Sequence, residues 1–127
     1  ANGMQFSLHN HAFEYALVEG VPAIYTLQEF LDPGINFQVD TYWVKVAGQD
    51  PAAVVRRFGA HAPLLHIKDG PATKEADMTA VGDGVMDVAG IIQAGEPYTQ
   101  WLIVELDCCA TDILAAVEKS YKYLSRL

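Results

Sequence analysis

The chain has 127 residues, 51% of them hydrophobic and 19% charged, with a net charge of −8 at pH 7. This length and apolar content suit one domain with a buried core, while the negative charge disfavours binding to the phosphate backbone of nucleic acids. No apolar run approaches the roughly 18 residues that span a membrane, and no signal segment opens the chain, so we expect no membrane association. Adjacent cysteines rarely bridge each other, so Cys108 and Cys109 predict reduced thiols and a cytoplasmic protein.

Four apolar segments rich in strand-forming residues recur along the chain, each followed by polar residues and then by an amphipathic segment. The four predicted strands are residues 4–8, 37–39, 64–67 and 101–104. They end, in chain order, in His9-Asn10-His11, Asp40, Lys68-Asp69-Gly70 and Glu105-Leu106-Asp107. This recurrence predicts four strand–helix units in a single domain over residues 1–127.

Helix-start signals lie between these strands. Asp50-Pro51 places a cap before a proline at the first helical position, and the other candidates are a Thr26/Glu29 capping box, Asp87 and Thr111. Because the strands are continuously apolar rather than alternating, they predict a parallel sheet that is buried on both faces. Alternation of strands with helices then predicts an α/β fold.

Two α/β architectures fit this order. A doubly wound open sheet usually has a glycine-rich phosphate-binding turn after its first strand, but the first glycine after residues 4–8 is Gly20. A (β/α)8 TIM barrel gathers ionisable residues from several strand ends at one face, which matches this chain better. A whole barrel needs ~250 residues, so we expect half a barrel with four parallel strand–helix units.

Half a barrel has two open sheet edges and, we expect, an apolar interior without a partner. The prediction is therefore that the half-barrel is completed by oligomerisation, as a homodimer, or by a missing N-terminal half. Residues 1–4 read as the glycine-capped end of a helix that enters a strand, which favours a preceding unit. The alternative interpretation of these residues is a tag remnant or an ordinary terminus.

Ionisable side chains at or just beyond the strand ends form the candidate site. Glu14, Asp40, His66 and Glu105 follow one another at intervals of about one strand–helix unit, so a barrel would bring them to one face. Carboxylate and imidazole ligands suit Mg²⁺, Mn²⁺ or Co²⁺, and also Zn²⁺. Taken singly, Asp40 also reads as a helix cap, Glu14 as a solvated loop residue and His66 as a core histidine. The recurrence of the set favours a divalent metal site.

Four segments resemble, in order, the sugar phosphate isomerase/epimerase family, the xylose-isomerase-like group of TIM barrels. They are LHNHAFEY (8–15), VDTYWV (39–44), LHIKDG (65–70) and IVELD (103–107). The resemblance covers nearly the whole chain and corresponds to strands five to eight of the family's barrel. It implies the C-terminal half of that barrel.

The resemblance also implies that Asp40, His66 and Glu105 bind the metal from strands six, seven and eight. In the family's ketose epimerases the strand-five ligand is a glutamate on the strand itself, but this chain has Leu8 or His9 there. Glu14 is therefore the candidate for the fourth ligand, with His9 or His11 as the substitute.

The implied reaction is metal-dependent isomerisation or epimerisation of a sugar or polyol ketone by proton transfer through an enediolate, whose charge a divalent ion stabilises. Glu14 and Glu105 are the candidates for carrying the proton. Lys68 is the candidate for stabilising the oxyanion, with an ion pair to Asp69 as its structural alternative. The alternatives to an active enzyme are a non-catalytic metal- or sugar-binding half-barrel and a truncated fragment that is inactive without its N-terminal half.

The candidate substrate-binding residues are His9, His11 and Trp43. Trp43, like Phe13 and Tyr42, is a candidate for stacking against the apolar face of a sugar, with packing as the alternative. Residues 70–86 lie at the same end of the predicted sheet, where we expect them to act as a lid. The few arginines all fall in predicted helices. We therefore expect an unphosphorylated small sugar or polyol as the substrate.

Overall fold

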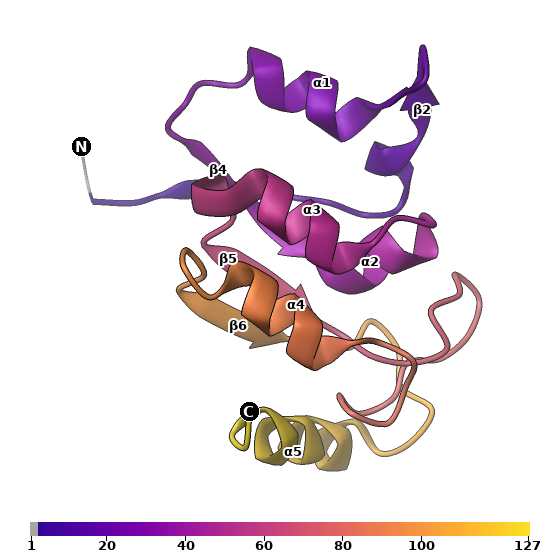
Figure 1. The fold of residues 1–127 in the computed structure, drawn as a ribbon. Helices are drawn as coiled ribbons and strands as arrows, with labels where there is room; N and C mark the ends of the chain where they lie inside the picture. The colour runs from indigo at the N-terminus through magenta and orange to yellow at the C-terminus, as the bar shows by residue number, and fades with distance from the viewer. Residues whose placement is uncertain (1–2) are drawn as a thin grey trace.

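The computed structural model describes residues 3–127 and shows an α/β fold with a four-stranded parallel sheet (Figure 1). The strands lie in the order β1-β4-β5-β6, so that each pairs with the next of the four along the chain. Their bounds are β1 Phe6–His9, β4 Ile35–Asp40, β5 Leu64–Ile67 and β6 Trp101–Val104. A parallel sheet whose strands follow chain order is the arrangement that a (β/α) barrel requires.

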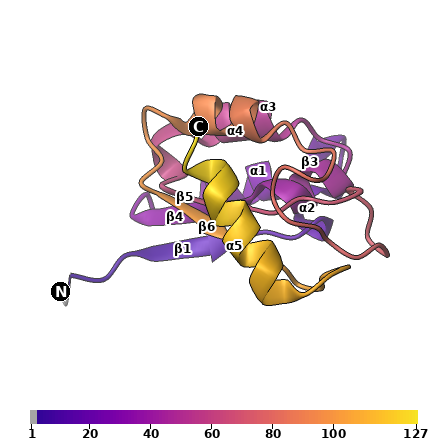
Figure 2. The same ribbon diagram turned by 90° about the horizontal axis from the view of Figure 1, so that it is seen from below.

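Helices α1, α3 and α4 cover one face of this sheet, and α5 lies next to β6 (Figures 1 and 2). The helices are α1 Ala23–Phe30, α2 Thr41–Val46, α3 Pro51–Phe58, α4 Val88–Gly95 and α5 Ile113–Leu124. The short elements are η1 Phe13–Tyr15, η2 Gly59–His61 and an antiparallel hairpin of β2 Leu17–Val18 and β3 Val21–Pro22. No helix of the described residues is both long and apolar enough to cross a membrane.

The hydrophobic core lies between the sheet and these helices. Phe37 and Val39 of β4 and Leu65 and Ile67 of β5 are buried there against apolar side chains of α1, α3 and α4. Because strand side chains alternate between faces, the intervening positions point to the opposite face. On β1, β4 and β5 that face is mostly polar, which contradicts the expectation of an apolar interior, whereas β6 contributes Trp101 and Ile103. Its residues on β1, β4 and β5 include Ser7, His9, Asn36, Gln38, Asp40 and His66.

The predicted element boundaries are partly confirmed. The strands at 64–67 and 101–104 are confirmed residue for residue, while β1 begins two residues later than predicted and β4 is longer at both ends.

Asp50 and Asp87 cap α3 and α4 through backbone N–H groups. The Thr26/Glu29 capping box is wrong, because the β2–β3 hairpin delivers the chain directly into α1. The last helix is capped by Asp112 rather than Thr111. Residues 1 and 2 of the predicted helix end lie outside the described residues.

Residues 70–86, the predicted lid, are held in place at both ends. The buried Asp69 carboxylate accepts hydrogen bonds from the backbone N–H groups of Gly70 (2.8 Å), Gly82 (2.9 Å) and Met86 (3.1 Å). Its own carbonyl accepts from the Thr79 N–H at 3.0 Å. The middle of the segment, residues 71–77, is mostly exposed. The loop is thus a fixed rim with one protruding stretch.

Replacing Asp69 by Ala is expected to lower the free energy of unfolding by about 3 kcal/mol, because three backbone donors would lose a charged acceptor. Urea denaturation measures this change. Asp77→Ala is the matched control: Asp77 is exposed in the same loop, and its loss should change stability by less than about 0.5 kcal/mol. Equal stability of the two variants would show that the Asp69 carboxylate does not hold the loop.

Candidate metal and substrate site

Side chains from all four strand ends meet at the carboxyl edge of the sheet. We call His9, Asp40, His66, Lys68 and Glu105 the strand-end cluster. The register places Asp40 opposite His66 and Ile67 opposite Val104, so the residues after β5 and β6 reach the same level. His9, Asp40 and His66 each offer one ligand atom, and these three atoms lie within 4.8 Å of one another.

Asp40 is the most strongly positioned member of the cluster. Its side chain is fully buried, and Oδ1 accepts a hydrogen bond from the Trp43 N–H at 3.0 Å as the cap of α2. Asn10 holds the Asp40 backbone, accepting from its N–H at 2.9 Å and donating to its carbonyl at 3.3 Å. Oδ2 is buried without an aligned hydrogen bond. The fold therefore leaves one carboxylate oxygen of Asp40 available to a ligand inside the cluster.

Burial raises the pKa of Asp40, and the Trp43 N–H and the Lys68 charge oppose that rise only in part. The Lys68 Nζ atom lies 3.0 Å from Asp40 Oδ2. This contact is an ion pair by distance but not a well-formed hydrogen bond, so Asp40 Oδ2 has an ionic partner and no hydrogen bond. A further cationic partner would relieve the cost of this buried carboxylate.

His66 and Glu105 form a short pair. His66 Nδ1 lies 2.6 Å from Glu105 Oε2, and the Thr41 hydroxyl donates to the His66 carbonyl at 2.9 Å. Burial alone would raise the pKa of Glu105, but hydrogen bonds from Lys68 and His66 lower it below its ordinary value. Glu105 is therefore an ionised carboxylate at neutral pH.

Lys68 is 1% exposed and lies among three carboxylates. Its Nζ atom is 2.8 Å from Glu105 Oε2 and donates to both oxygens of Asp107 at 2.9 and 3.0 Å, besides the contact with Asp40. Burial lowers the pKa of Lys68, but these hydrogen bonds and negative charges outweigh it and raise the pKa above the ordinary value. Its predicted structural partner, Asp69, instead binds the loop backbone.

The residues present fit a divalent cation. His9 Nε2 lies 4.0 Å from Asp40 Oδ2, and the His9 and His66 rings are 4.8 Å apart between centroids. Burial lowers the pKa of His9, which favours the neutral imidazole that binds metals, and its Nδ1 is buried without a partner. Two imidazoles with one or two carboxylates suit Mn²⁺, Co²⁺ or Zn²⁺ better than Mg²⁺, which prefers oxygen ligands.

The structure does not bring Glu14 to the cluster. Its Oε2 atom accepts a hydrogen bond from the backbone N–H of His11 at 2.8 Å, so the carboxylate closes its own turn. His9, one of the two predicted substitutes, lies beside Asp40 and His66. His11 is exposed, and its ring stacks on Phe13 at a centroid distance of 5.6 Å.

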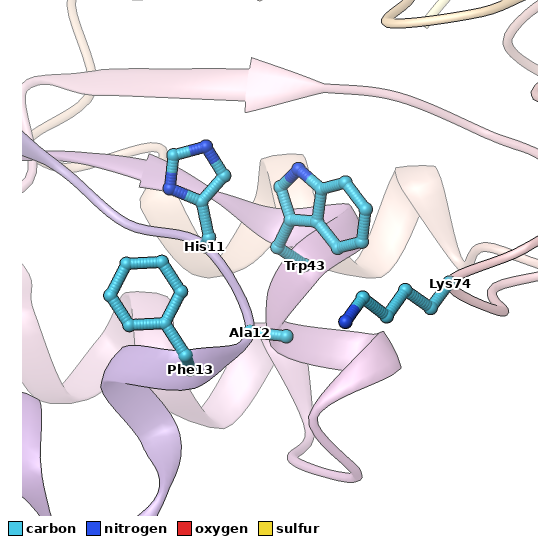
Figure 3. A pocket seen from close by; sticks show the side chains of 5 residues that line it. All are labelled: His11, Ala12, Phe13, Trp43 and Lys74. Atoms are coloured by element: carbon cyan, nitrogen blue, oxygen red, sulfur yellow. The ribbon is translucent and has the colours of Figure 1, made fainter.

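An open pocket of about 350 Å³ adjoins the cluster, lined by His11, Ala12, Phe13, Trp43 and Lys74 (Figure 3). His11 and Phe13 come from the segment after β1, Trp43 from α2, and Lys74 from the protruding part of the loop. The Lys68 ammonium lies 5.9 Å from the Trp43 ring centroid, and the His9 and His11 rings are 4.9 Å apart. Trp43 and the two histidines therefore form the boundary between the cluster and the pocket.

Three functional positions were missed from the sequence. Asn10 holds the backbone of Asp40, Asp107 binds Lys68, and Thr41 supports His66. Asn10 and Asp107 belong to the polar tails that follow the first and fourth strands, which was the available signal. Thr41 had no signal of its own, because its hydroxyl contacts a strand that is distant in sequence.

Solved structures share this fold. The chain is similar to a sugar phosphate isomerase/epimerase from Parabacteroides distasonis, with 27% identity and a TM-score of 0.83 over 96% of this chain and 45% of that one. A second sugar phosphate isomerase/epimerase from that organism is 22% identical, with a TM-score of 0.77 over 94% and 44% of the two chains. A xylose isomerase domain protein from Alicyclobacillus acidocaldarius is 18% identical, with a TM-score of 0.63 over 98% and 50%. No protein-family model and no curated protein sequence matches the chain.

The chain thus spans about half the length of the proteins that it resembles. Its four parallel strand–helix units are half of a (β/α)8 barrel of this kind, which confirms the predicted fold class and family resemblance.

Proposed function

We propose that this half-barrel, which has the fold of the sugar phosphate isomerases/epimerases, binds a divalent metal ion and serves the isomerisation or epimerisation of a sugar or polyol ketone. The observation that carries the proposal is the convergence of His9, Asp40 and His66 at the strand ends, beside a pocket with aromatic walls. Carboxyl ends of barrel strands are where such enzymes place their chemistry.

The ion would supply electrostatic stabilisation for the negative charge that develops on the sugar oxygens. Glu105 is the best-placed proton acceptor: its lowered pKa keeps it ionised, and its contacts with His66 and Lys68 both use Oε2, so Oε1 is engaged by neither. Lys68, the buried ammonium of the cluster, adds a positive charge to the site in which an oxyanion would form. Glu14, held on the His11 N–H, has no such role in this geometry.

The pocket supports a sugar without a phosphate group. Phe13 and Trp43 offer aromatic surface to the apolar face of a ring. No arginine lines the pocket among the described residues, and Arg57 stacks on Tyr25 instead. Lys74 is the single cationic side chain of that lining. A neutral ketose or polyol ketone therefore fits the pocket better than a sugar phosphate does.

We also propose that a second copy of the chain completes the barrel. β1 and β6 are the outer strands of the sheet, and Phe6 and Trp101 on them are 65% and 66% exposed. An open pocket of about 350 Å³ lies between β6 and α5 and is lined by Leu102, Val104, Val117, Tyr121, Leu124 and Ser125. Unpaired strand edges with apolar flanks are surfaces that proteins normally cover. Two-fold pairing of β1 with the partner's β6 would cover both edges.

Calorimetric titration of metal-stripped protein with Mn²⁺, Co²⁺ and Zn²⁺ tests the first part, and we expect one ion per chain. The loaded protein is then incubated with neutral ketoses and inososes in D₂O, with phosphorylated ketoses as the comparison. Deuterium incorporated next to the carbonyl reports proton transfer even where the product is unknown. Ion binding without deuterium incorporation would favour a non-catalytic metal-binding half-barrel, and the absence of both would reject the proposal.

A further inference from the structure

Lys68 contacts the same oxygens that a metal ion needs. Its Nζ atom lies 3.0 Å from Asp40 Oδ2 and 2.8 Å from Glu105 Oε2. Asp40 Oδ2 is also the carboxylate oxygen that faces the two histidines, at 4.0 Å from His9 and 3.9 Å from His66. An ion coordinated by Asp40 Oδ2 and a histidine would therefore approach the ammonium group closely, and like charges at such distances repel strongly in a buried site.

The negative charges around Lys68 exceed its single positive charge, so they could also balance a second cation. Asp40, Glu105 and Asp107 bring three negative charges and Lys68 one positive charge, so the four together carry two negative charges. A divalent ion would neutralise that remainder. A lysine that served only to balance its neighbours would leave this excess without a counter-charge. The set of groups thus suits Lys68 and an ion together, provided that the ammonium moves away from the ligand oxygens.

Asp107 offers the place to which the ammonium can move. Both of its oxygens accept from Lys68, at 2.9 and 3.0 Å, and its side chain is 40% exposed, outside the His9–Asp40–His66 group. The lysine stem is flexible, and the ammonium is a compact charge with three donors. A short displacement toward Asp107 would preserve this contact while it releases Asp40 and Glu105.

We propose that Lys68 is a built-in counter-cation that occupies the carboxylates of the metal-free site and withdraws onto Asp107 when the ion binds. This inference rests on the metal site proposed above. Lys68 acts here as a positioning residue. It keeps the buried Asp40 carboxylate paired in the metal-free chain, where an unpaired buried charge would be destabilising, and it lowers the affinity for the ion because the ion must displace it.

Lys68→Met tests the competition directly. Methionine keeps much of the length of the side chain without its charge, so we expect divalent ions to bind about tenfold more tightly or better in calorimetry. Lys68→Arg retains the charge and should bind no more tightly than the parent chain. A purely structural role predicts the opposite result for Lys68→Met, because loosening the site would weaken binding.

Asp107→Asn tests the proposed movement of the Lys68 ammonium onto Asp107. Without the Asp107 charge, Lys68 stays on Asp40 and Glu105, and binding of Mn²⁺ should weaken about tenfold. In the Lys68→Met background the same substitution should have a much smaller effect, which a double-mutant cycle measures. Equal effects of Asp107→Asn in both backgrounds would show that Asp107 acts on the ion directly, and would reject the movement of Lys68 onto Asp107.

The parent chain provides a further measurement, in which a variant serves only to assign one resonance. Zn²⁺ titrated into protein with ¹⁵N-labelled lysine should shift the ammonium resonance of Lys68, identified by its loss in Lys68→Arg. If Zn²⁺ binds the parent chain but this resonance does not move and Lys68→Met binds no more tightly, the counter-cation inference is rejected and the metal site stands. If neither the parent nor Lys68→Met binds any ion, the metal site itself is rejected, and the inference with it.

Discussion

Asp40→Asn is expected to weaken divalent-ion binding by more than about 100-fold, because it removes the charge of the central ligand. Loss of a group that only supports a ligand typically costs 10–100-fold, so loss of the ligand should cost at least as much. Asparagine is also a good helix cap, so the variant keeps an acceptor for the Trp43 N–H and should remain folded. Calorimetry with Mn²⁺ and circular dichroism measure the two properties.

Asp50→Asn is the matched control for that substitution. Asp50 caps α3 through the Ala52 N–H at 3.0 Å, as Asp40 caps α2, but it lies outside the strand-end cluster. Its replacement should leave ion affinity unchanged. Glu105→Gln is expected to have an intermediate effect, a loss of roughly 10–100-fold. Unchanged affinity in Asp40→Asn would remove this residue from the ligand set and would contradict the proposed metal centre.

A dimer is the expected state of the chain at micromolar concentration, and Val117→Glu should disrupt it. Val117 lines the apolar pocket between β6 and α5 and is 42% exposed in the single chain. A carboxylate buried there by a partner would lack a counter-charge, so we expect dissociation to become at least about 100-fold easier. Size-exclusion chromatography with light scattering across a concentration series measures this change.

Ala115→Glu introduces the same charge on α5 at an exposed position outside that pocket, and it should leave the dimer intact. Closure of two half-barrels would bring two strand-end clusters to one mouth, each with an excess of negative charge. Divalent ions should therefore strengthen the dimer by relieving repulsion between them. A well-folded monomer at high concentration, with or without ions, would contradict closure by a second copy.

The sequence alone determined the elements whose signals are local. The strands at 64–67 and 101–104 follow from short apolar runs between polar residues, and the caps Asp50 and Asp87 follow from side chains that bond to backbone groups two or three residues away. Recurrence of these units was enough to predict half a barrel. It also placed the candidates Asp40, His66 and Glu105 at one edge, since parallel strands end together.

Tertiary structure decided which atoms meet, because those contacts join residues that are distant along the chain. Glu14 was free in the sequence to be a ligand, but in the turn after β1 it is fastened to the His11 N–H, whereas His9 at the end of β1 lies 4.0 Å from Asp40. Lys68 reaches Asp107 only because β5 and β6 pair in register. The surfaces that this chain leaves without a partner also depend on tertiary structure. A pattern of apolar residues shows that one face of a strand is to be buried, but only the assembled sheet shows which surfaces stay uncovered.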